Sequence, residues 1–352
     1  MLNQRTPDIR CKKPPAGLSL CHMEEIFMQI YLAPMEGITG YIVRNAFHHH
    51  FGCIDKYFTP FIPAAKRLNY KILRDLSPSN NEGIRLIPQL ISNDAAETLE
   101  MINILKDHGF SEFNINLGCP SGTVTSKKRG SGLLLYPEML NRFLDGLYKK
   151  ADVPVSVKTR IGYESMEEWP ELLDIYSGYP VSELIIHPRL RKEQYSGFPH
   201  LDAFERAYRV YADCSRTRTD TDACVTSLCY NGDIWTAENY ELITGRFPDI
   251  KAVMLGRGLL ARPDLGCVLK GIRLQDTRKR IISFCDEIYN GYLSIFDGEK
   301  DAVMHMKEIW ANLGASFRDS ERLVKKLMKC SSAAEYKAIT SQIFETLELS
   351  AR

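Results

Sequence analysis

A cysteine and a basic loop follow directly on a short run that alternates polar and apolar side chains. The run 113–117 reads FNINL, Cys119 comes two residues later, and Lys127, Lys128 and Arg129 stand a little further on. A thiol with an ordinary pKa of about 8.5 is mostly protonated at neutral pH, so Cys119 is a candidate proton donor. The alternative is a small buried side chain without a chemical role. Its place beyond the end of the run favours the first interpretation.

Other apolar runs also end in side chains that can take part in chemistry. Lys158 follows VPVSV, and His187 ends ELIIH. A solvated lysine and a structural histidine remain the alternatives for these two. Polar, proline or methionine residues occupy the same point of further runs, namely Pro34, Met35, Glu36, Gln89, Asn116, Arg160 and Arg189.

Two glycine-containing tripeptides, one on each side of residue 250, indicate a site that binds a phosphate group. The segment 231–233 reads NGD, and 256–258 reads GRG. Glycine lets the backbone approach a ligand closely, and arginine binds phosphate through two parallel hydrogen bonds. In a parallel barrel, the loops after the last two strands often form a phosphate site. Together with the thiol, this predicts redox or proton-transfer chemistry on a phosphate-bearing cofactor.

The elements that position these residues alternate between strands and helices. Helical spacing is clearest in 39–51, 94–108 and 137–149, with Asp94 as an N-cap and Gly109 as a stop. Strands alternating with helices of this length predict parallel βαβ units. The fold class is therefore α/β, a (β/α)8 TIM barrel, with a doubly wound open sheet as the alternative. The expected strands are 30–35, 54–58, 84–91, 113–117, 153–159, 183–187, 224–231 and 251–256.

The chain after residue 270 differs in character from what precedes it. It contains no proline, and its apolar residues recur three and four apart. We expect a C-terminal helical bundle domain at 271–352, a barrel domain at 28–270 and a flexible leader at 1–27. Translation can begin at Met1, Met23 or Met28.

Composition limits the classes of partner and compartment. The formal net charge is +1, so a polyanion must be bound by local basic patches. There is no apolar run of the roughly 20 residues that a membrane helix needs, and no signal peptide. The ten cysteines form no C-x-x-C pair and no zinc-type cluster. We expect free thiols in a reducing cytoplasm, no metal and no membrane contact.

Eight motifs in order give the chain a resemblance to a known family. The chain resembles the tRNA-dihydrouridine synthases over about 30–270, and any one motif alone is weak evidence of that. The motifs are APMEGIT (33–39), PQLI (88–91), NINLGCPS (114–121), GSGLLLYPEML (130–140), VPVSVKTRIG (153–162), IIHPR with EQYSG (185–197), NGDIW (231–235) and AVMLGRGLL (252–260).

The resemblance implies FMN at the barrel mouth, reduced by NADPH. It implies hydride transfer to carbon 6 of a uracil extruded from tRNA, and proton donation from Cys119 to carbon 5. Lys158 would face the pyrimidine end of the flavin, and Asn116 would contact the uracil. Lys127, Arg129 and Arg189 would contact RNA near the mouth, and the helical domain would add RNA contacts. The FMN residues would be Pro34, Met35, Glu36, Gln89, Lys158, His187, Asn231, Gly232, Asp233, Gly256 and Arg257. We expect a monomer.

The sequence also departs from the family pattern. Gly40 stands where many members have aspartate, and Ser121, Gly122 and Thr123 stand where many have a lysine. Two alternatives remain. One is an FMN barrel oxidoreductase of the dihydroorotate-dehydrogenase type that acts on a small molecule, and the other is an RNA-binding protein without catalysis.

Overall fold

The computed structural model describes residues 28–217 and 226–350, with side chains left out at 213–217. The expected leader at 1–27 and the start of the expected strand 224–231 lie outside the described residues. In the described part, ten short strands form one sheet, and every pairing in it is parallel. They are β1 (Gln29–Leu32), β2 (Lys56–Phe58), β3 (Ile62–Pro63), β4 (Leu86–Ile87), β5 (Gln89–Ile91), β6 (Phe113–Leu117), β7 (Val155–Arg160), β8 (Glu183–His187), β9 (Ser227–Tyr230) and β10 (Ala252–Leu255).

The sheet closes on itself, which confirms the barrel and excludes the doubly wound alternative. From β5 to β10 successive strands pair in chain order, β10 pairs with β1, and β1 pairs with β2. The expected strand 84–91 is divided at Pro88, which has no N–H to donate. Its two halves pair separately, β4 with β2 and β5 with β3, so β2 and β3 act as one broken strand. The eight expected strands are thus present, several of them shorter than expected.

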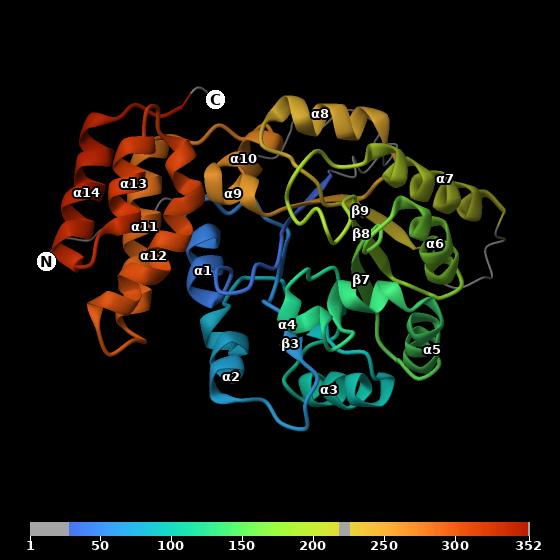
Figure 1. The fold of residues 1–352 in the computed structure, drawn as a ribbon. Coiled ribbons are helices and arrows are strands. Elements are labelled where there is room, and N and C mark those ends of the chain that lie inside the picture. The colour runs from blue at the N-terminus through green and yellow to red at the C-terminus, as the bar shows by residue number, and fades with distance from the viewer. Residues whose placement is uncertain (1–27, 218–225, 351–352) are drawn as a thin grey trace, which may run out of the picture.

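Helices surround the barrel, as Figure 1 shows. In α3 the Asp94 side chain accepts a hydrogen bond from the Glu97 N–H (2.9 Å), and Gly109 follows the helix at a φ of 92°. Both confirm the expected cap and stop. The barrel-side helices are α1 (Tyr41–His50), α2 (Tyr70–Leu76), α3 (Ala95–Asp107), α4 (Gly122–Thr125), α5 (Pro137–Tyr148), α6 (Trp169–Ser177), α7 (Leu201–Thr217), α8 (Ala237–Arg246), α9 (Arg257–Ala261) and α10 (Leu265–Leu269).

Apolar side chains fill both sides of the sheet. One cluster lies between the strands and the helices, and a second fills the barrel interior with residues such as Tyr31, Phe58, Ile185 and Met254. The barrel is therefore a packed core, and ligands are confined to its mouth. The parallel register sets Asn116 beside Lys158 and Arg160 beside His187 at the carboxyl ends of β6, β7 and β8.

Four further helices follow the barrel, as the proline-free sequence predicts. They are α11 (Thr277–Leu293), α12 (Glu299–Leu313), α13 (Glu321–Lys329) and α14 (Ala333–Thr346). They lie beside α1 at one side of the barrel (Figure 1). The α1–α11 contact is close, because the Phe47 and Phe284 rings lie 4.8 Å apart and Glu287 binds both His49 and His50 at 2.8 Å. None of the helices in the described ranges is long and apolar enough to span a membrane.

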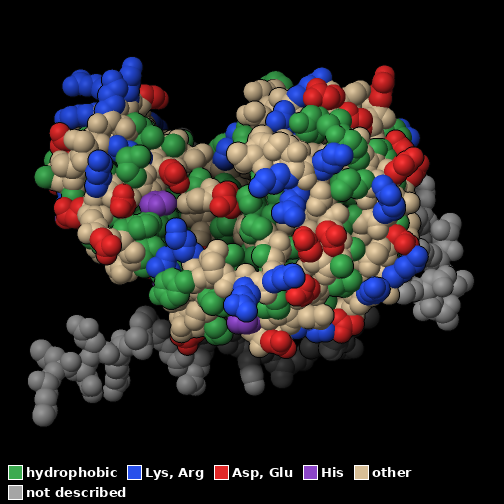
Figure 2. Space-filling model, turned by 60° about the horizontal axis from the view of Figure 1, so that its bottom comes forward, with side chains coloured by type: hydrophobic (Ala, Val, Ile, Leu, Met, Phe, Trp, Pro, Cys, Tyr) green, Lys and Arg blue, Asp and Glu red, His purple; other side chains and the backbone are tan. Residues whose placement is uncertain are grey.

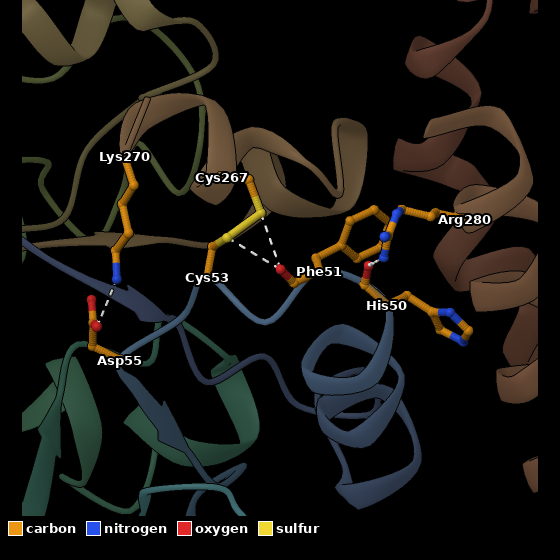
Figure 3. Close-up of a disulfide and its surroundings, with 7 residues drawn as sticks. All are labelled: His50, Phe51, Cys53, Asp55, Cys267, Lys270 and Arg280. Carbon is orange, nitrogen blue, oxygen red and sulfur yellow. Dashed lines mark hydrogen bonds and ion pairs between the residues drawn. A yellow bond between two sulfur atoms is a disulfide. The ribbon is translucent and has the colours of Figure 1, made fainter. Parts of the chain in front are cut away.

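The expectation that all thiols are free is wrong for two cysteines. A disulfide joins Cys53, in the segment after α1, to Cys267 in α10. Figure 3 shows this bond beside the Lys270–Asp55 ion pair (2.6 Å), which joins the same two segments. Sequence could not pair these cysteines, because 214 residues separate them. Among the described residues Cys119, Cys229, Cys285 and Cys330 are free.

Candidate active site

A cavity opens at the carboxyl ends of β1, β7, β8, β9 and β10. Most of the residues expected to bind the cofactor line it, although they come from five separate parts of the chain. Those residues are Pro34, Met35, Lys158, His187, Asn231, Gly232, Asp233, Gly256 and Arg257. Ala33, Tyr195, Ile234, Trp235 and Gly258 complete the wall. The shared edge of a parallel barrel explains this convergence.

Asp233 organises one end of the cavity by binding two arginines. Arg189 donates to both carboxylate oxygens of Asp233, at 3.1 and 2.5 Å, and Arg257 donates to Oδ1 at 2.8 Å. Arg189 is fully buried, whereas Arg257 is partly exposed on the cavity wall. The carboxylate therefore holds two guanidinium groups in fixed orientations, and one of them remains accessible.

The backbone approaches closely on either side of this arginine pair. A side chain at Gly258 would place its Cβ 2.2 Å from the Ile234 carbonyl oxygen. A Cβ at Gly232 would lie 2.1 Å from the Tyr230 hydroxyl. A side chain on either glycine would overlap these protein atoms, so close packing requires glycine at both positions. Gly258 is buried, whereas Gly232 is partly exposed on the cavity wall.

Positive charge dominates the cavity. Burial lowers the pKa of His187 well below its usual value, and the charges of Arg160, Lys158, Arg189 and Arg257 lower it further. His187 is therefore neutral at pH 7. Burial also lowers the pKa of Lys158 to about 8, and the Arg160 charge adds to this shift. The crowding of cations suits an anionic ligand, which would relieve their mutual repulsion.

Cys119 lies on the loop after β6 and is held through its neighbours. Asn116 Oδ1 accepts hydrogen bonds from the N–H groups of Gly118 (3.1 Å) and Cys119 (2.9 Å). The hydroxyl and N–H of Ser131 both donate to the Cys119 carbonyl, at 2.7 and 3.1 Å. Arg160 Nε donates to the Gly118 carbonyl at 3.0 Å. Each of these backbone groups of Gly118 and Cys119 thus has a hydrogen-bond partner, and together these bonds fix the position of the Cys119 backbone.

A chain of buried amides extends from this loop into the barrel. Asn116 Nδ2 donates to Gln89 Oε1 (2.7 Å), and Gln89 Nε2 donates to Asn114 Oδ1 (2.7 Å). Asn114 Nδ2 donates in turn to the Ser156 hydroxyl (2.9 Å). Buried amides must find such partners, because an unpaired one costs about 1–3 kcal/mol. Gln89 lies inside this chain and not on the cavity wall.

The thiol of Cys119 keeps its proton at neutral pH. Burial raises its pKa and the Glu36 carboxylate raises it further, against the opposing effects of the Ser121 backbone N–H and of Arg160 and Lys158. Cys119 does not line the cavity itself, but Asn116, three residues before it, pairs in register with Lys158 of the cavity wall. Glu36 itself does not line the cavity.

The three residues expected to contact RNA fall in two different places. Lys127 is exposed on the loop after Cys119, and Arg129 on the same loop pairs with Glu97 at 3.5 Å. Arg189 is fully buried against Asp233 and does not line the cavity, so its side chain is not exposed for an RNA contact.

Three further residues around the cavity were not among the predicted site residues. Arg160 positions Gly118, while Tyr195 and Trp235 lie against Arg257. All three stand in the family motifs, in VPVSVKTRIG, EQYSG and NGDIW. The sequence places Arg160 at the end of its strand but assigns it no role, while the available signal for Tyr195 and Trp235 was an aromatic residue in a loop that follows a strand.

The closed parallel barrel, with a cationic cavity at the carboxyl ends of its strands, defines a TIM-barrel protein with a candidate site at the usual end of the barrel. The family model described as dihydrouridine synthase (Dus) matches residues 31–350. The chain belongs to the dihydrouridine synthase family.

Curated relatives extend this result. A protein of Pseudomonas putida named tRNA-dihydrouridine(16) synthase is 30% identical over 255 residues, which cover 70% of this chain and 74% of the relative. Its counterpart in Pseudomonas syringae is 29% identical over 68% of this chain and 73% of the relative. A probable tRNA-dihydrouridine synthase of Staphylococcus epidermidis is 27% identical over 86% of this chain and 90% of the relative.

Proposed function

We propose that the protein is a flavin-dependent tRNA-dihydrouridine synthase. It reduces the 5,6 double bond of a uracil in tRNA, with FMN as cofactor and NADPH as reductant. The observation that carries the proposal is the combination of a cationic cavity and a protonated thiol within one barrel mouth. Family membership and the names of the relatives support the same substrate class.

The cavity fits FMN by its chemistry. The partly exposed guanidinium of Arg257 suits the phosphate, and Gly232 lies on the same cavity wall. The Lys158 ammonium suits the end of the flavin that becomes negative on reduction. When bound, the reduced flavin supplies the hydride for carbon 6 of the uracil. Pro34, Met35, His187, Asn231 and Gly256 complete the proposed contacts, while Gln89 and Glu36 stay predictions as flavin residues.

Cys119 supplies the proton for carbon 5. Its raised pKa keeps the thiol protonated at pH 7, so it acts as an acid and not as a nucleophile. Asn116 and Ser131 hold the backbone on both sides of it. A direct contact of Asn116 with the uracil remains a proposal, since its carbonyl oxygen already accepts two hydrogen bonds.

RNA binding follows from exposed basic side chains. The target edge of a uracil is inaccessible in a stacked base, so the base must leave the stack at a cost of a few kcal/mol. Lys127 and Arg129, on the loop after Cys119, would bind phosphates beside an extruded base, and Arg129 would have to exchange its Glu97 partner to do so. The C-terminal helices add further basic residues.

The test is a mapping of dihydrouridine in RNA by mass spectrometry. In tRNA from cells that lack the gene, one nucleoside should be two mass units lighter than in wild-type cells, because it stays uridine. A plasmid copy of the wild-type gene should restore the heavier nucleoside, and a copy with Cys119→Ala should not. The number in the names of the two Pseudomonas relatives makes uridine 16 the first position to examine.

The control is the state of the variant protein. Purified Cys119→Ala should bind FMN and tRNA as the wild type does, because the substitution removes only the sulfur. Unchanged tRNA, together with reduction of a free pyrimidine or enone by the purified protein, would favour the small-molecule oxidoreductase. A colourless protein that binds tRNA but no FMN would favour a non-catalytic RNA-binding role.

A further inference from the structure

The Arg257 guanidinium lies against two aromatic rings. Its Cζ is 4.5 Å from the centre of the Tyr195 ring and 5.2 Å from that of Trp235. The same guanidinium donates to Asp233 at 2.8 Å. Three contacts therefore fix a side chain that is 31% exposed and faces the cavity.

Tyr195 is held in turn by the other arginine of the pair. It lies in the segment between β8 and α7, where Arg189 donates to the carbonyls of Ser196 (3.2 Å) and Gly197 (2.7 Å). Gln194 and Gly197 take left-handed backbone conformations, with φ of 51° and 66°. The buried Arg189 thus links the position of the Tyr195 ring to Asp233.

Trp235 reaches the same guanidinium from a different loop. It follows Asp233 by two residues on the loop after β9, and its backbone N–H donates to Asn239 at 3.2 Å. Both rings line the cavity and are partly exposed, at 52% for Tyr195 and 36% for Trp235. The Tyr195 ring also lies 5.6 Å from the Arg160 guanidinium and 6.0 Å from the His187 ring, both longer contacts than the one with Arg257.

We propose that Tyr195 and Trp235 form an aromatic clamp that holds Arg257 ready for the phosphate of the cofactor. This inference rests on the proposed function, and it makes both rings positioning residues. A free arginine side chain loses rotamer freedom when it binds an anion, and contact with two rings restricts that freedom beforehand. The anion then gains affinity through preorganisation.

The test separates the phosphate from the flavin ring. FMN and riboflavin, which lacks the phosphate, are titrated into the flavin-free protein while flavin fluorescence is followed. Tyr195→Leu should weaken FMN binding about five- to tenfold, in line with the removal of one cation–π interaction, and riboflavin binding by less than about twofold. Tyr195→Phe keeps the ring and should bind FMN as the wild type does.

A matched control comes from the same segment. Phe198 is 88% exposed, so Phe198→Leu changes a nearby aromatic residue without touching the clamp and should leave both affinities unchanged. Trp235→Leu is the second variant, and it carries the test if Tyr195→Leu does not fold. In an Arg257→Gln background the effect of Tyr195→Leu should nearly vanish, because the guanidinium that the ring positions is absent.

Several outcomes would overturn the inference. Equal weakening of FMN and riboflavin binding would mean that the rings contact the flavin ring itself. Unchanged FMN binding with a raised KM for tRNA would mean that they stack on RNA bases. Unchanged values throughout would remove any role for the clamp, although wild-type binding of FMN would still support the proposed function. A wild type that binds no FMN would reject both proposals.

Discussion

Cys119 shows how a reactive side chain is positioned through neighbouring backbone groups. No charged group needs to touch the sulfur, because Asn116, Ser131 and Arg160 bind the peptide groups on either side of it. Its pKa is raised by burial, which suits an acid. A cysteine that acts as a nucleophile needs the opposite shift, since the thiolate is the reactive form.

Lys158 makes the site sensitive to pH near neutrality. Its pKa of about 8 means that it is mostly charged at pH 7 and mostly neutral at about pH 9.5. We expect the rate of flavin reduction by NADPH to fall about tenfold as pH rises through 8, because the charge that favours the reduced ring disappears. Stopped-flow absorbance of the flavin from about pH 6.5 to 9.5 measures this rate.

Two substitutions of Lys158 serve as controls for this prediction. Lys158→Met should be slow at every pH and show no step near 8. Lys158→Arg keeps its charge above pH 8, so its rate should not fall there. A wild-type rate that stays flat from about pH 7 to 9.5 would contradict the role of Lys158.

At the scale of elements, the barrel has a strand that is divided by a proline and a disulfide that joins its first and last units. Pro88 divides one strand into β4 and β5, and Gln89 directly after it enters the amide chain behind Cys119. The Cys53–Cys267 disulfide joins the segment after α1 to α10, which comes directly after the short helix α9 that begins at Arg257. The barrel is thus closed between its first and last units by a covalent bond as well as by the β1–β10 pairing.

Reduction of this disulfide should destabilise the folded protein. A cross-link over 214 residues restricts the unfolded chain, and the typical contribution is about 2–4 kcal/mol to the free energy of unfolding. We expect a reducing agent to lower the thermal midpoint by several degrees. Calorimetry with and without dithiothreitol measures the shift. The midpoint of Cys53→Ala should not respond to the reagent, and a wild-type midpoint that is equally insensitive would refute the prediction.

At the scale of the whole molecule, the barrel and the C-terminal helices form two masses with a hollow between them (Figure 2). Lysine and arginine side chains gather at the outer end of the mass on the left, which the C-terminal helices form. On α13, the side chains of Lys325, Lys326 and Lys329 are all exposed, while Leu327 is buried. This basic face provides local attraction for a polyanion that a net charge of +1 does not.

Removal of charge from α13 should weaken tRNA binding without affecting the flavin site. We expect Lys325→Gln, Lys326→Gln and Lys329→Gln together to raise the Kd for tRNA about tenfold or more at low salt. The slope of log K against log salt should fall by up to about 0.9 for each phosphate that the variant no longer binds. Filter binding at several salt concentrations gives both numbers, with FMN affinity as the internal reference.

A single substitution elsewhere is the matched control. Lys150 is exposed just after α5 on the barrel wall, so Lys150→Gln removes the same charge away from α13. It should change the Kd less than Lys326→Gln does. Equal effects of the two would mean that binding follows net charge and not this face.

Most of the fold was predictable because its signals are local. Apolar runs, the Asp94 cap and the Gly109 stop are set by a few adjacent residues, and the structure has all of them. The short strand β3 was missed because two residues with Pro63 as the second carry no strand pattern. The division of 84–91 at Pro88 is also a local effect, since it follows from the missing N–H of proline.

The sequence by itself determined most of the side chains that line the mouth, because chain order places them after strands and a parallel barrel brings those ends together. Only the tertiary structure decided their partners. Arg189 pairs with Asp233, Arg257 contacts the rings of Tyr195 and Trp235, and Cys53 forms a disulfide with Cys267. Each pairing joins residues that are distant along the chain or on separate loops. Packing of the whole barrel sets such distances, and no local pattern of residues encodes them.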